Sequence, residues 1–183
     1  MMVIHKYLPK FYFDSLFDIP YDEFYQQGIK VLLFDLDNTL ILPNSNQLDA
    51  KTELFLNQIS LRFRIGIISN ATKKKQKRVL NDRFCSIYLK WYQKKPAKWG
   101  FIQFLKLFNV CREQVVMIGD QLTTDILGAN KMEIISILVK PLNRLDEFFL
   151  TKWRRFLLER PFISKIKKNN PLLFQQKFKN FIK

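Results

Sequence analysis

The sequence contains a single histidine, His5, and only two cysteines in 183 residues. One histidine disfavours a zinc site built on histidine ligands and also a Ser-His or Cys-His nucleophile. Cys85 and Cys111 lack the spacing of a CxxC motif, so we expect both to be small core residues in a reducing compartment. Enzymatic chemistry in this chain should therefore rely on carboxylates, lysine and a hard cation.

Long hydrophobic runs are also missing. Lys6, Lys10, Asp14 and Asp18 interrupt the N-terminal segment, so we expect no secretory signal there. No stretch approaches the roughly 18–20 uncharged apolar residues that a membrane-spanning helix needs. The expected location is cytoplasmic, and peripheral contact with a membrane stays open.

Acidic residues are few, because 16 Asp and Glu stand against 31 Lys and Arg and leave a net charge of +15. This excess favours an anionic partner such as nucleic acid, a ribosomal particle or an anionic membrane, without distinguishing among them. The length of 183 residues and the 48% hydrophobic composition predict one ordinary core with tails.

The most informative stretch is VLLFDLDNTLIL, at positions 31–42. The unbroken apolar run Val31–Phe34 predicts a strand that is buried on both faces. Asp35 and Asp37 follow it, at the carboxyl end of the strand, where ligands bind in open parallel sheets. Two adjacent carboxylates are unfavourable unless a cation or a shared proton compensates their charge, so the pair predicts a metal site.

Apolar and amphipathic segments alternate through the rest of the core. This alternation predicts an α/β fold with a Rossmann-like, doubly wound parallel sheet of about five strands. Further strands are expected at Arg64–Ser69, Phe84–Tyr88, Gln114–Ile118 and Ile134–Val139, and helices at Tyr21–Gln27, Leu48–Phe63, Ala71–Asp82, Lys98–Phe108 and a short segment ending near Asn130.

Three regions follow from this pattern: an aromatic N-terminal lead-in (1–30) that packs on the core, the core itself (31–140), and a basic, amphipathic helical extension (141–183). We expect Arg160-Pro161 and Asn169–Pro171 to divide the extension into pieces. Its aromatic face either docks on the sheet or another subunit, or lies on an anionic membrane. RNA is a further candidate partner for the tail, and an oligomer stays open.

Four polar clusters lie at strand ends or at a loop-to-helix junction, and in a parallel sheet they converge on one edge. Each alone has a bland structural explanation, such as a turn, a helix cap or a solvated lysine. Their order and joint placement favour phosphoryl transfer instead. The clusters are Asp35–Thr39, Ser69-Asn70, Lys94–Pro96 and Gly119–Asp125.

In this interpretation Asp35 is the nucleophile that forms an aspartyl-phosphate, and Asp37 is the general acid and base. The transferring phosphoryl group would be bound by Ser69, Asn70 and Lys95.

Hard oxygen ligands for Mg²⁺ would come from Asp35, from Asp37 through its carbonyl, and from Asp120. Asp125 would lie behind them and orient Lys95 or a metal-bound water.

The set FDLDNTL, SN, KKP and GDQLTTD resembles the four signature motifs of the haloacid dehalogenase (HAD) superfamily of aspartyl-phosphate phosphatases. This resemblance adds Thr39 to the phosphate-binding residues, and it assigns the third motif to Lys95, before Pro96, over the adjacent Lys94. Segments of the lead-in resemble the YqeG-like HAD-IIIA phosphatases, which are similar to mitochondrial phosphatidylglycerophosphate phosphatases. These segments are Leu8-Pro9, Ser15–Ile19 and Gly28–Lys30.

The short spacing between the motifs leaves no room for a cap domain, so the resemblance implies a capless HAD fold with an open site. An open site favours a bulky phosphate ester, such as the phospholipid phosphatidylglycerophosphate, or a small one in an oligomer whose neighbour closes the site. Nucleotide or nucleic-acid phosphate ends stay open as substrates. So does a basic RNA- or ribosome-associated factor whose phosphatase site is vestigial.

Overall fold

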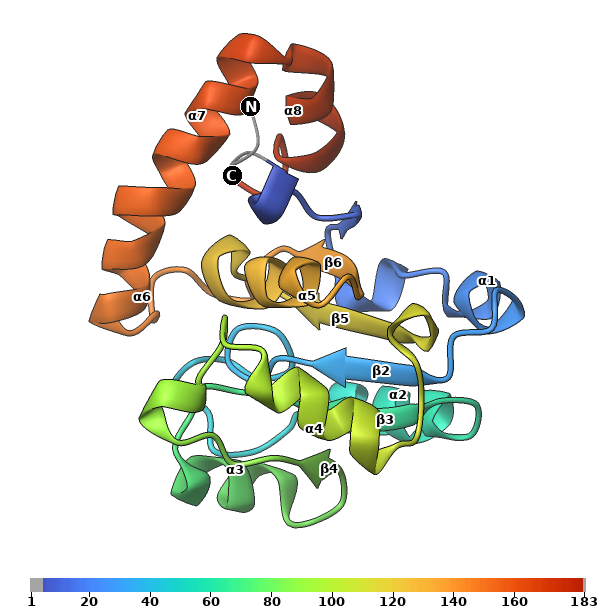
Figure 1. The fold of residues 1–183 in the computed structure, drawn as a ribbon. Helices are drawn as coiled ribbons and strands as arrows, with labels where there is room; N and C mark the ends of the chain where they lie inside the picture. Colours follow the sequence, from blue (N-terminus) through green and yellow to red (C-terminus); the bar gives the residue numbers. More distant parts are fainter. Residues whose placement is uncertain (1–4, 183) are drawn as a thin grey trace.

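Six parallel strands form one sheet in the computed structural model, which describes residues 5–182 (Figure 1). The order of the strands across the sheet is β1-β6-β5-β2-β3-β4. The α/β parallel architecture is as predicted. The strands are β1 (Phe11–Phe13), β2 (Val31–Phe34), β3 (Arg64–Ile67), β4 (Cys85–Ser86), β5 (Val115–Gly119) and β6 (Ile135–Val139).

The sheet has one strand more than the five expected, because the lead-in contributes β1. Phe11 pairs with Ile137, and Phe13 pairs with Val139 at the edge of the sheet. Three residues are too few to show strand periodicity, and their partners lie far along the chain, so no local pattern indicates this strand. The expected strand Phe84–Tyr88 is also shorter, since only Cys85 and Ser86 pair with β3.

β2 lies in the middle of the sheet, between β3 and β5. Val31 pairs with Arg64 on one side and with Val115 on the other. All four residues of β2 are fully buried, which is what its unbroken apolar run predicts. The residue that follows, Asp35, is therefore fixed on a rigid central strand.

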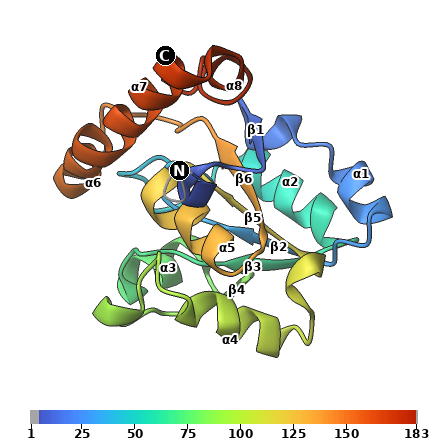
Figure 2. The ribbon, with the colours of Figure 1, turned by 45° about the horizontal axis from the view of Figure 1, so that its top comes forward.

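Helices cover both faces of the sheet (Figure 2). Leu32 and Phe34 face one core with Leu56 of α2, while Val31 and Leu33 face the other with Phe101 of α4. The helices are α1 (Tyr21–Gln26), α2 (Ala50–Ser60), α3 (Lys73–Leu80), α4 (Trp99–Leu107), α5 (Leu127–Lys131), α6 (Phe149–Arg154), α7 (Arg160–Asn169) and α8 (Pro171–Lys177).

Several helices are shorter than expected, because capping residues end them early. Asp49 accepts a hydrogen bond from the Thr52 N–H and so starts α2 at Ala50. Asn81 adopts a left-handed conformation (φ 46°) and ends α3. Gly28, with φ of 86°, follows α1 as predicted, because a glycine enters this region without a steric cost.

The cysteine prediction was half wrong. Cys85 is partly buried against the core on the α4 side, but Cys111 is exposed. Cys111 lies just before a 3₁₀ turn, Arg112–Gln114, at the amino end of β5, where the chain runs over the surface. Both thiols are free.

The extension contains one long helical segment and a short final helix. A π-helical turn, η6 (Arg155–Glu159), joins α6 to α7, so the expected break at Arg160-Pro161 is absent. The Arg160 N–H bonds to the Arg155 carbonyl five residues back, and this wider turn accommodates the proline ring and its missing N–H. The break at Asn169–Pro171 is present, and Asn170 caps α8.

α7 and α8 dock on the body of the protein, while the aromatic face of α6 does not. The docked side chains are Ile163, Ile166, Phe174, Phe178 and Phe181, which pack around Leu122, Ile126 and Leu138. Phe149 and Trp153 remain more than half exposed. Of α6, α7 and α8, therefore, only α7 and α8 dock on the body of the protein.

No helix within residues 5–182 combines the length and the apolarity that crossing a membrane requires.

Candidate active site

Three buried aspartates meet at the carboxyl ends of β2 and β5. Asp35 directly follows β2, and its N–H donates to the Ile118 carbonyl on β5 at 2.9 Å. Asp120 follows β5, and Asp125 lies in the π-helical turn η5 (Leu122–Ile126) that comes next. One carboxylate oxygen from each lies within 4.8 Å of the others, and all three residues are buried.

Lys95 bridges two of these carboxylates. Its Nζ lies 2.6 Å from Asp35 Oδ1 and 2.7 Å from Asp125 Oδ1. Lys95 is 3% exposed, whereas the adjacent Lys94 is on the surface. The structure thus places Lys95, and not Lys94, at the centre of the cluster.

Asn70 holds the backbone of Lys95. Its side-chain amide donates to the Lys95 carbonyl at 3.0 Å, and its side-chain oxygen accepts from the Lys95 N–H at 2.8 Å. The neighbouring Ser69 is buried, and its Oγ accepts from the Ala71 N–H at 3.1 Å. Both residues follow β3 at the predicted edge, but Asn70 uses its side chain to position the lysine.

Close packing behind the cluster fixes Asp125. Its Oδ2 accepts from the Gln121 N–H at 3.0 Å, and its Oδ1 accepts from the Thr124 hydroxyl at 3.3 Å. A Cβ at Gly119 would lie 2.4 Å from Asp125 Oδ2 and 2.6 Å from its Cβ, so only glycine fits there. Gly119-Asp120 is therefore more than a tight turn, because the missing side chain of Gly119 leaves room for Asp125.

Asp37 is not part of the cluster of three buried aspartates and pairs with a lysine instead. Its Oδ1 pairs with Lys75 of α3, and Lys75 Nζ also donates to the Pro43 carbonyl. The Asp37 side chain is 34% exposed, so it lies at the open side of the site. In the sequence Lys75 is one of several lysines in a basic helix, and nothing local distinguishes it as the partner of Asp37.

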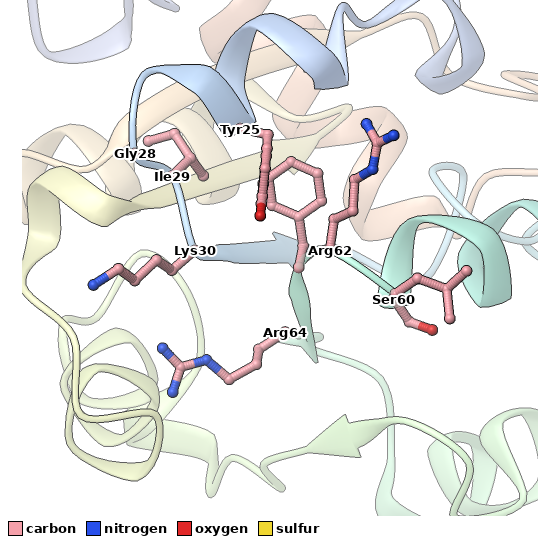
Figure 3. A pocket seen from close by; sticks show the side chains of 9 residues that line it. Tyr25, Gly28, Ile29, Lys30, Ser60, Arg62 and Arg64 are labelled. Atoms are coloured by element: carbon pink, nitrogen blue, oxygen red, sulfur yellow. The ribbon is translucent and has the colours of Figure 1, made fainter.

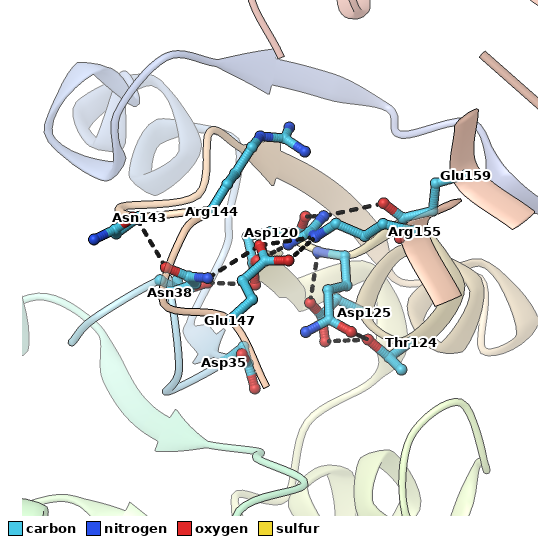
Figure 4. Close-up of polar contacts among 12 residues, drawn as sticks. Asp35, Asn38, Asp120, Thr124, Asp125, Asn143, Arg144, Glu147, Arg155 and Glu159 are labelled. Atoms are coloured by element: carbon cyan, nitrogen blue, oxygen red, sulfur yellow. Dashed lines mark hydrogen bonds and ion pairs between the residues drawn. The ribbon is translucent and has the colours of Figure 1, made fainter. Parts of the chain in front are cut away.

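The structure also brings Thr39 and an unexpected arginine to Asp120. The Thr39 hydroxyl donates to Asp120 Oδ1 at 3.3 Å. Arg155, from the extension, donates to Asp120 Oδ2 and, at 3.0 Å, to the Asp120 carbonyl (Figure 4). Glu147 and Glu159 hold the same guanidinium, at 2.9 and 3.0 Å.

Sequence reasoning missed Arg155 because it is one of many basic residues in the extension, and nothing local distinguishes it. The only signal was indirect. The aromatic residues mark one side of the helix, and Arg155 falls on the opposite side, together with Glu159. Asn38, with φ of 64°, extends the network by donating to Glu147 Oε1 at 3.1 Å.

Burial dominates the electrostatics of the site. It raises the pKa of Asp35 to about 7, with Lys95 opposing and Asp125 and Asp37 adding to the rise. Burial likewise raises the pKa of Asp120 against the opposing effect of Arg155. For Lys95, burial lowers the pKa, but Asp125 and Asp35 outweigh it and the net direction is upward.

The buried cluster therefore carries more potential negative than positive charge. Its two buried cations are Lys95 and Arg155. Its five buried carboxyl groups belong to Asp35, Asp120, Asp125, Glu147 and Glu159.

A separate pocket of about 640 Å³ lies at the other edge of the sheet, at the amino ends of β2 and β3 (Figure 3). Tyr25, Lys30, Arg62 and Arg64 are among its lining residues. Arg62 pairs with Asp22, and Arg64 donates to the Phe108 carbonyl, so both arginines are already engaged. This pocket takes no part in the site around Asp35.

A sequence model of the family described as mitochondrial PGP (phosphatidylglycerophosphate) phosphatase matches residues 2–142, which include all four motifs. The chain belongs to this PGP phosphatase family. "Probable phosphatase YqeG" of Bacillus subtilis is 28% identical over 171 residues, which cover 93% of this chain and 97% of that protein. "Phosphatidylglycerophosphate phosphatase 1, chloroplastic" of Chlamydomonas reinhardtii is 26% identical over 155 residues, covering 73% of this chain and 57% of that protein.

Solved structures place this member of the PGP phosphatase family in the HAD fold. The putative HAD-hydrolase YfnB from Bacillus subtilis, bound to magnesium, superposes with a TM-score of 0.51 at 15% identity, covering 61% of this chain and 89% of that one. An uncharacterized protein from Listeria monocytogenes gives 0.51 at 24% identity, covering 66% and 87%. The predictions of a Rossmann-like HAD fold and of a phosphatase are confirmed. Within residues 5–182, only α2, β3, α3, β4 and a 3₁₀ turn separate Asp37 from Lys95, and no cap domain is inserted.

Proposed function

We propose that this protein hydrolyses a phosphate monoester in a Mg²⁺-dependent reaction that passes through an aspartyl-phosphate on Asp35. The observation that carries the proposal is the position of the Asp35 carboxylate. It is fixed at the end of the central strand, 2.6 Å from the Lys95 ammonium and clustered with Asp120. A carboxylate held beside a buried cation is suited to attack phosphorus, because the incoming phosphoryl charge meets a positive partner.

The reaction consists of two displacements. In the first, an Asp35 carboxylate oxygen bonds to phosphorus, and the bond from phosphorus to the ester oxygen breaks while Asp37 gives that oxygen a proton. In the second, Asp37 takes a proton from water, whose oxygen bonds to phosphorus and releases Asp35 and inorganic phosphate. The exposed position of Asp37 suits this role, since both the leaving alcohol and water arrive from the open side.

The donor set fits Mg²⁺, because every candidate ligand is an oxygen and the buried cluster has an excess of carboxyl groups. Asp35, the carbonyl of Asp37 and Asp120 would hold the ion. When bound, Mg²⁺ supplies positive charge for the phosphoryl oxygens. The magnesium in the YfnB structure gives independent support.

The remaining site residues take different parts. Lys95 balances charge on the phosphoryl group, and Asp125 keeps the ammonium in place through its 2.7 Å contact. The Ser69 hydroxyl and Thr39 are phosphate-binding residues at the same edge. Asn70 contributes to phosphate binding by fixing Lys95, because its side-chain nitrogen and oxygen both form hydrogen bonds with the Lys95 backbone.

The proposed substrate is a phospholipid carrying a phosphate monoester, of which phosphatidylglycerophosphate is the first to test. Family membership supports it, as does the similarity to phosphatidylglycerophosphate phosphatase 1 of Chlamydomonas reinhardtii. The uncapped site also supports a bulky substrate whose remainder stays outside the protein.

A substrate panel tests this proposal. Purified protein is assayed with Mg²⁺ on an aryl phosphate, on phosphatidylglycerophosphate in mixed micelles, and on oligonucleotides phosphorylated at either end. Preference for the lipid supports the proposal. Turnover of the oligonucleotides with none of the lipid would instead assign a nucleic-acid end phosphatase.

A further inference from the structure

Large exposed apolar side chains concentrate in one part of the surface. Six of them lie within ten consecutive positions of the extension and are between 48% and 71% exposed. They form what we call the α6 face: Phe148, Phe149, Leu150, Trp153, Phe156 and Leu157. Such a continuous apolar surface is costly in water and marks an interaction site.

The α6 face lies beside the active site. α6 runs past the carboxyl ends of the strands in both views of the fold (Figures 1 and 2). The same helical segment sends Arg155 inward to Asp120, while Trp153, two residues earlier, is 56% exposed. One side of the helix therefore contacts the catalytic cluster, and the other is open to a partner.

A second exposed aromatic pair lies a few residues before Lys95 in the chain. Trp91 and Tyr92 are 83% and 57% exposed, and the centroids of their rings lie 5.7 Å apart. They belong to a 3₁₀ turn, Trp91–Gln93, in the segment that leaves β4 and leads to Lys95. Exposed Trp and Tyr side chains are typical of the interface between water and lipid.

The charge around the α6 face is positive. Lys152, Arg154 and Arg160 are exposed beside it. The acidic residues of this part of the chain are mostly turned inward, since Glu147 and Glu159 are buried against Arg155 and only Asp146 is exposed. Apolar and aromatic side chains flanked by cations match an anionic membrane surface, where the rings enter the interface and the cations meet phosphate groups.

We propose that the α6 face docks this protein on an anionic lipid bilayer and presents the site around Asp35 to the membrane. The lipid-substrate part of this inference rests on the proposed function, but the docking itself does not. The helix lies in the plane of the interface and does not span the bilayer. A phosphorylated headgroup then reaches Asp35 while its acyl chains stay in the membrane, which removes the need for a cap that would enclose the substrate.

A second copy of this chain is a poorer occupant for the α6 face. Each copy carries a net charge of +15, so two basic surfaces would have to approach each other. An anionic membrane reverses the sign of this interaction.

Vesicle flotation tests the docking directly. Wild-type protein should float with phosphatidylcholine vesicles that contain phosphatidylglycerol, and far less with phosphatidylcholine alone. Phe149→Ser combined with Trp153→Ser should weaken the partition about a hundredfold, because burial of each ring contributes about tenfold. Lys152→Gln combined with Arg154→Gln should weaken it only on the anionic vesicles.

The chain offers a matched control. Leu61 and Leu107 are 85% and 59% exposed but precede β3 and β5, at the opposite edge of the sheet. Leu61→Ser combined with Leu107→Ser removes the same number of exposed apolar side chains and should float like wild type. Equal losses in both double variants, or no flotation of the wild type, would overturn the proposal. A wild-type dimer that Phe149→Ser/Trp153→Ser converts to monomer would also overturn it and assign the face to a second copy.

Two further measurements separate the docking from the phosphatase activity. Asp35→Asn protein should float like wild type. Phe149→Ser/Trp153→Ser should keep full turnover of a soluble aryl phosphate and lose turnover of vesicle-embedded phosphatidylglycerophosphate. Flotation without any phosphatase activity supports the docking and contradicts the proposed function. Aryl phosphatase activity without flotation supports the proposed function and contradicts the docking.

Discussion

Arg155 and Asp120 join the C-terminal extension to the edge of the sheet that holds the candidate active site. The Arg155 guanidinium donates to both the side chain and the carbonyl of Asp120, and both residues are buried. The helix that carries the α6 face is thereby attached to a proposed metal ligand. The extension is thus part of the site, although it lies beyond the residues that the family model matches.

Replacement of Arg155 should lower the stability of the fold and weaken the binding of Mg²⁺. Arg155→Met would leave Asp120, Glu147 and Glu159 without their cation, which costs about 3–5 kcal/mol for a buried ion pair. Thermal unfolding and calorimetric titration with Mg²⁺ measure the two effects. Arg154→Met changes the neighbouring, exposed arginine and should leave both values near wild type. Equal behaviour of the two variants would remove Arg155 from this role.

Lys95 and Lys94 provide a second matched pair. Lys95→Met should lower kcat by about a hundredfold or more, because the phosphoryl group loses its nearest protein cation. It should also destabilise the fold, as Asp35 and Asp125 lose their shared partner. Lys94→Met should change neither property, because Lys94 is on the surface. A strong effect at Lys94 would contradict the assignment of the third motif.

Asp37 should matter most when the leaving alcohol is poor. Asp37→Asn cannot protonate the ester oxygen, so kcat/KM for an alkyl phosphate, which reports the first displacement only, should fall by a factor of about 10²–10⁴. The loss should be smaller on an aryl phosphate with an acidic phenol, which leaves without a proton. Rates across a series of phenols give the comparison. Equal losses on all substrates would mean that Asp37 does not act as the general acid.

Mg²⁺ should stabilise the protein as well as activate it. The buried carboxyl groups outnumber the buried cations, so a bound dication relieves their repulsion and binds the folded state selectively. EDTA should abolish turnover and lower the melting temperature, and added Mg²⁺ should restore both. In Asp120→Asn the melting temperature should respond less to Mg²⁺. Full activity in EDTA would contradict the metal dependence.

The parallel α/β fold and the edge of the sheet that holds the site could be predicted from the sequence, because their signals are local. The run Val31–Phe34 is buried on both faces, and polar residues follow it and β5 directly. The burial of Lys95 and the exposure of Lys94 could not be predicted from periodicity, since both precede the same helix. That choice came from a family resemblance.

The features that were missed depend on contacts between distant segments. β1 has only three residues and forms a strand because β6 offers it an edge. Arg155 reaches Asp120 over 35 positions of sequence. Pro161 was expected to break the helix, but the π-helical turn before it accommodates the proline. In each case tertiary packing, and not local propensity, decides the outcome.

Chemical trapping of the phosphoryl-enzyme tests the central claim most directly. Protein mixed with substrate and Mg²⁺ is quenched in acid during turnover, reduced with borohydride and digested for mass spectrometry. An aspartyl-phosphate at Asp35 is reduced to homoserine, so that residue should appear at position 35 in the wild type and be absent when substrate is omitted. Asp35→Asn should show neither the product nor turnover. Turnover without any modification at Asp35, or full activity of Asp35→Asn, would contradict the proposed mechanism.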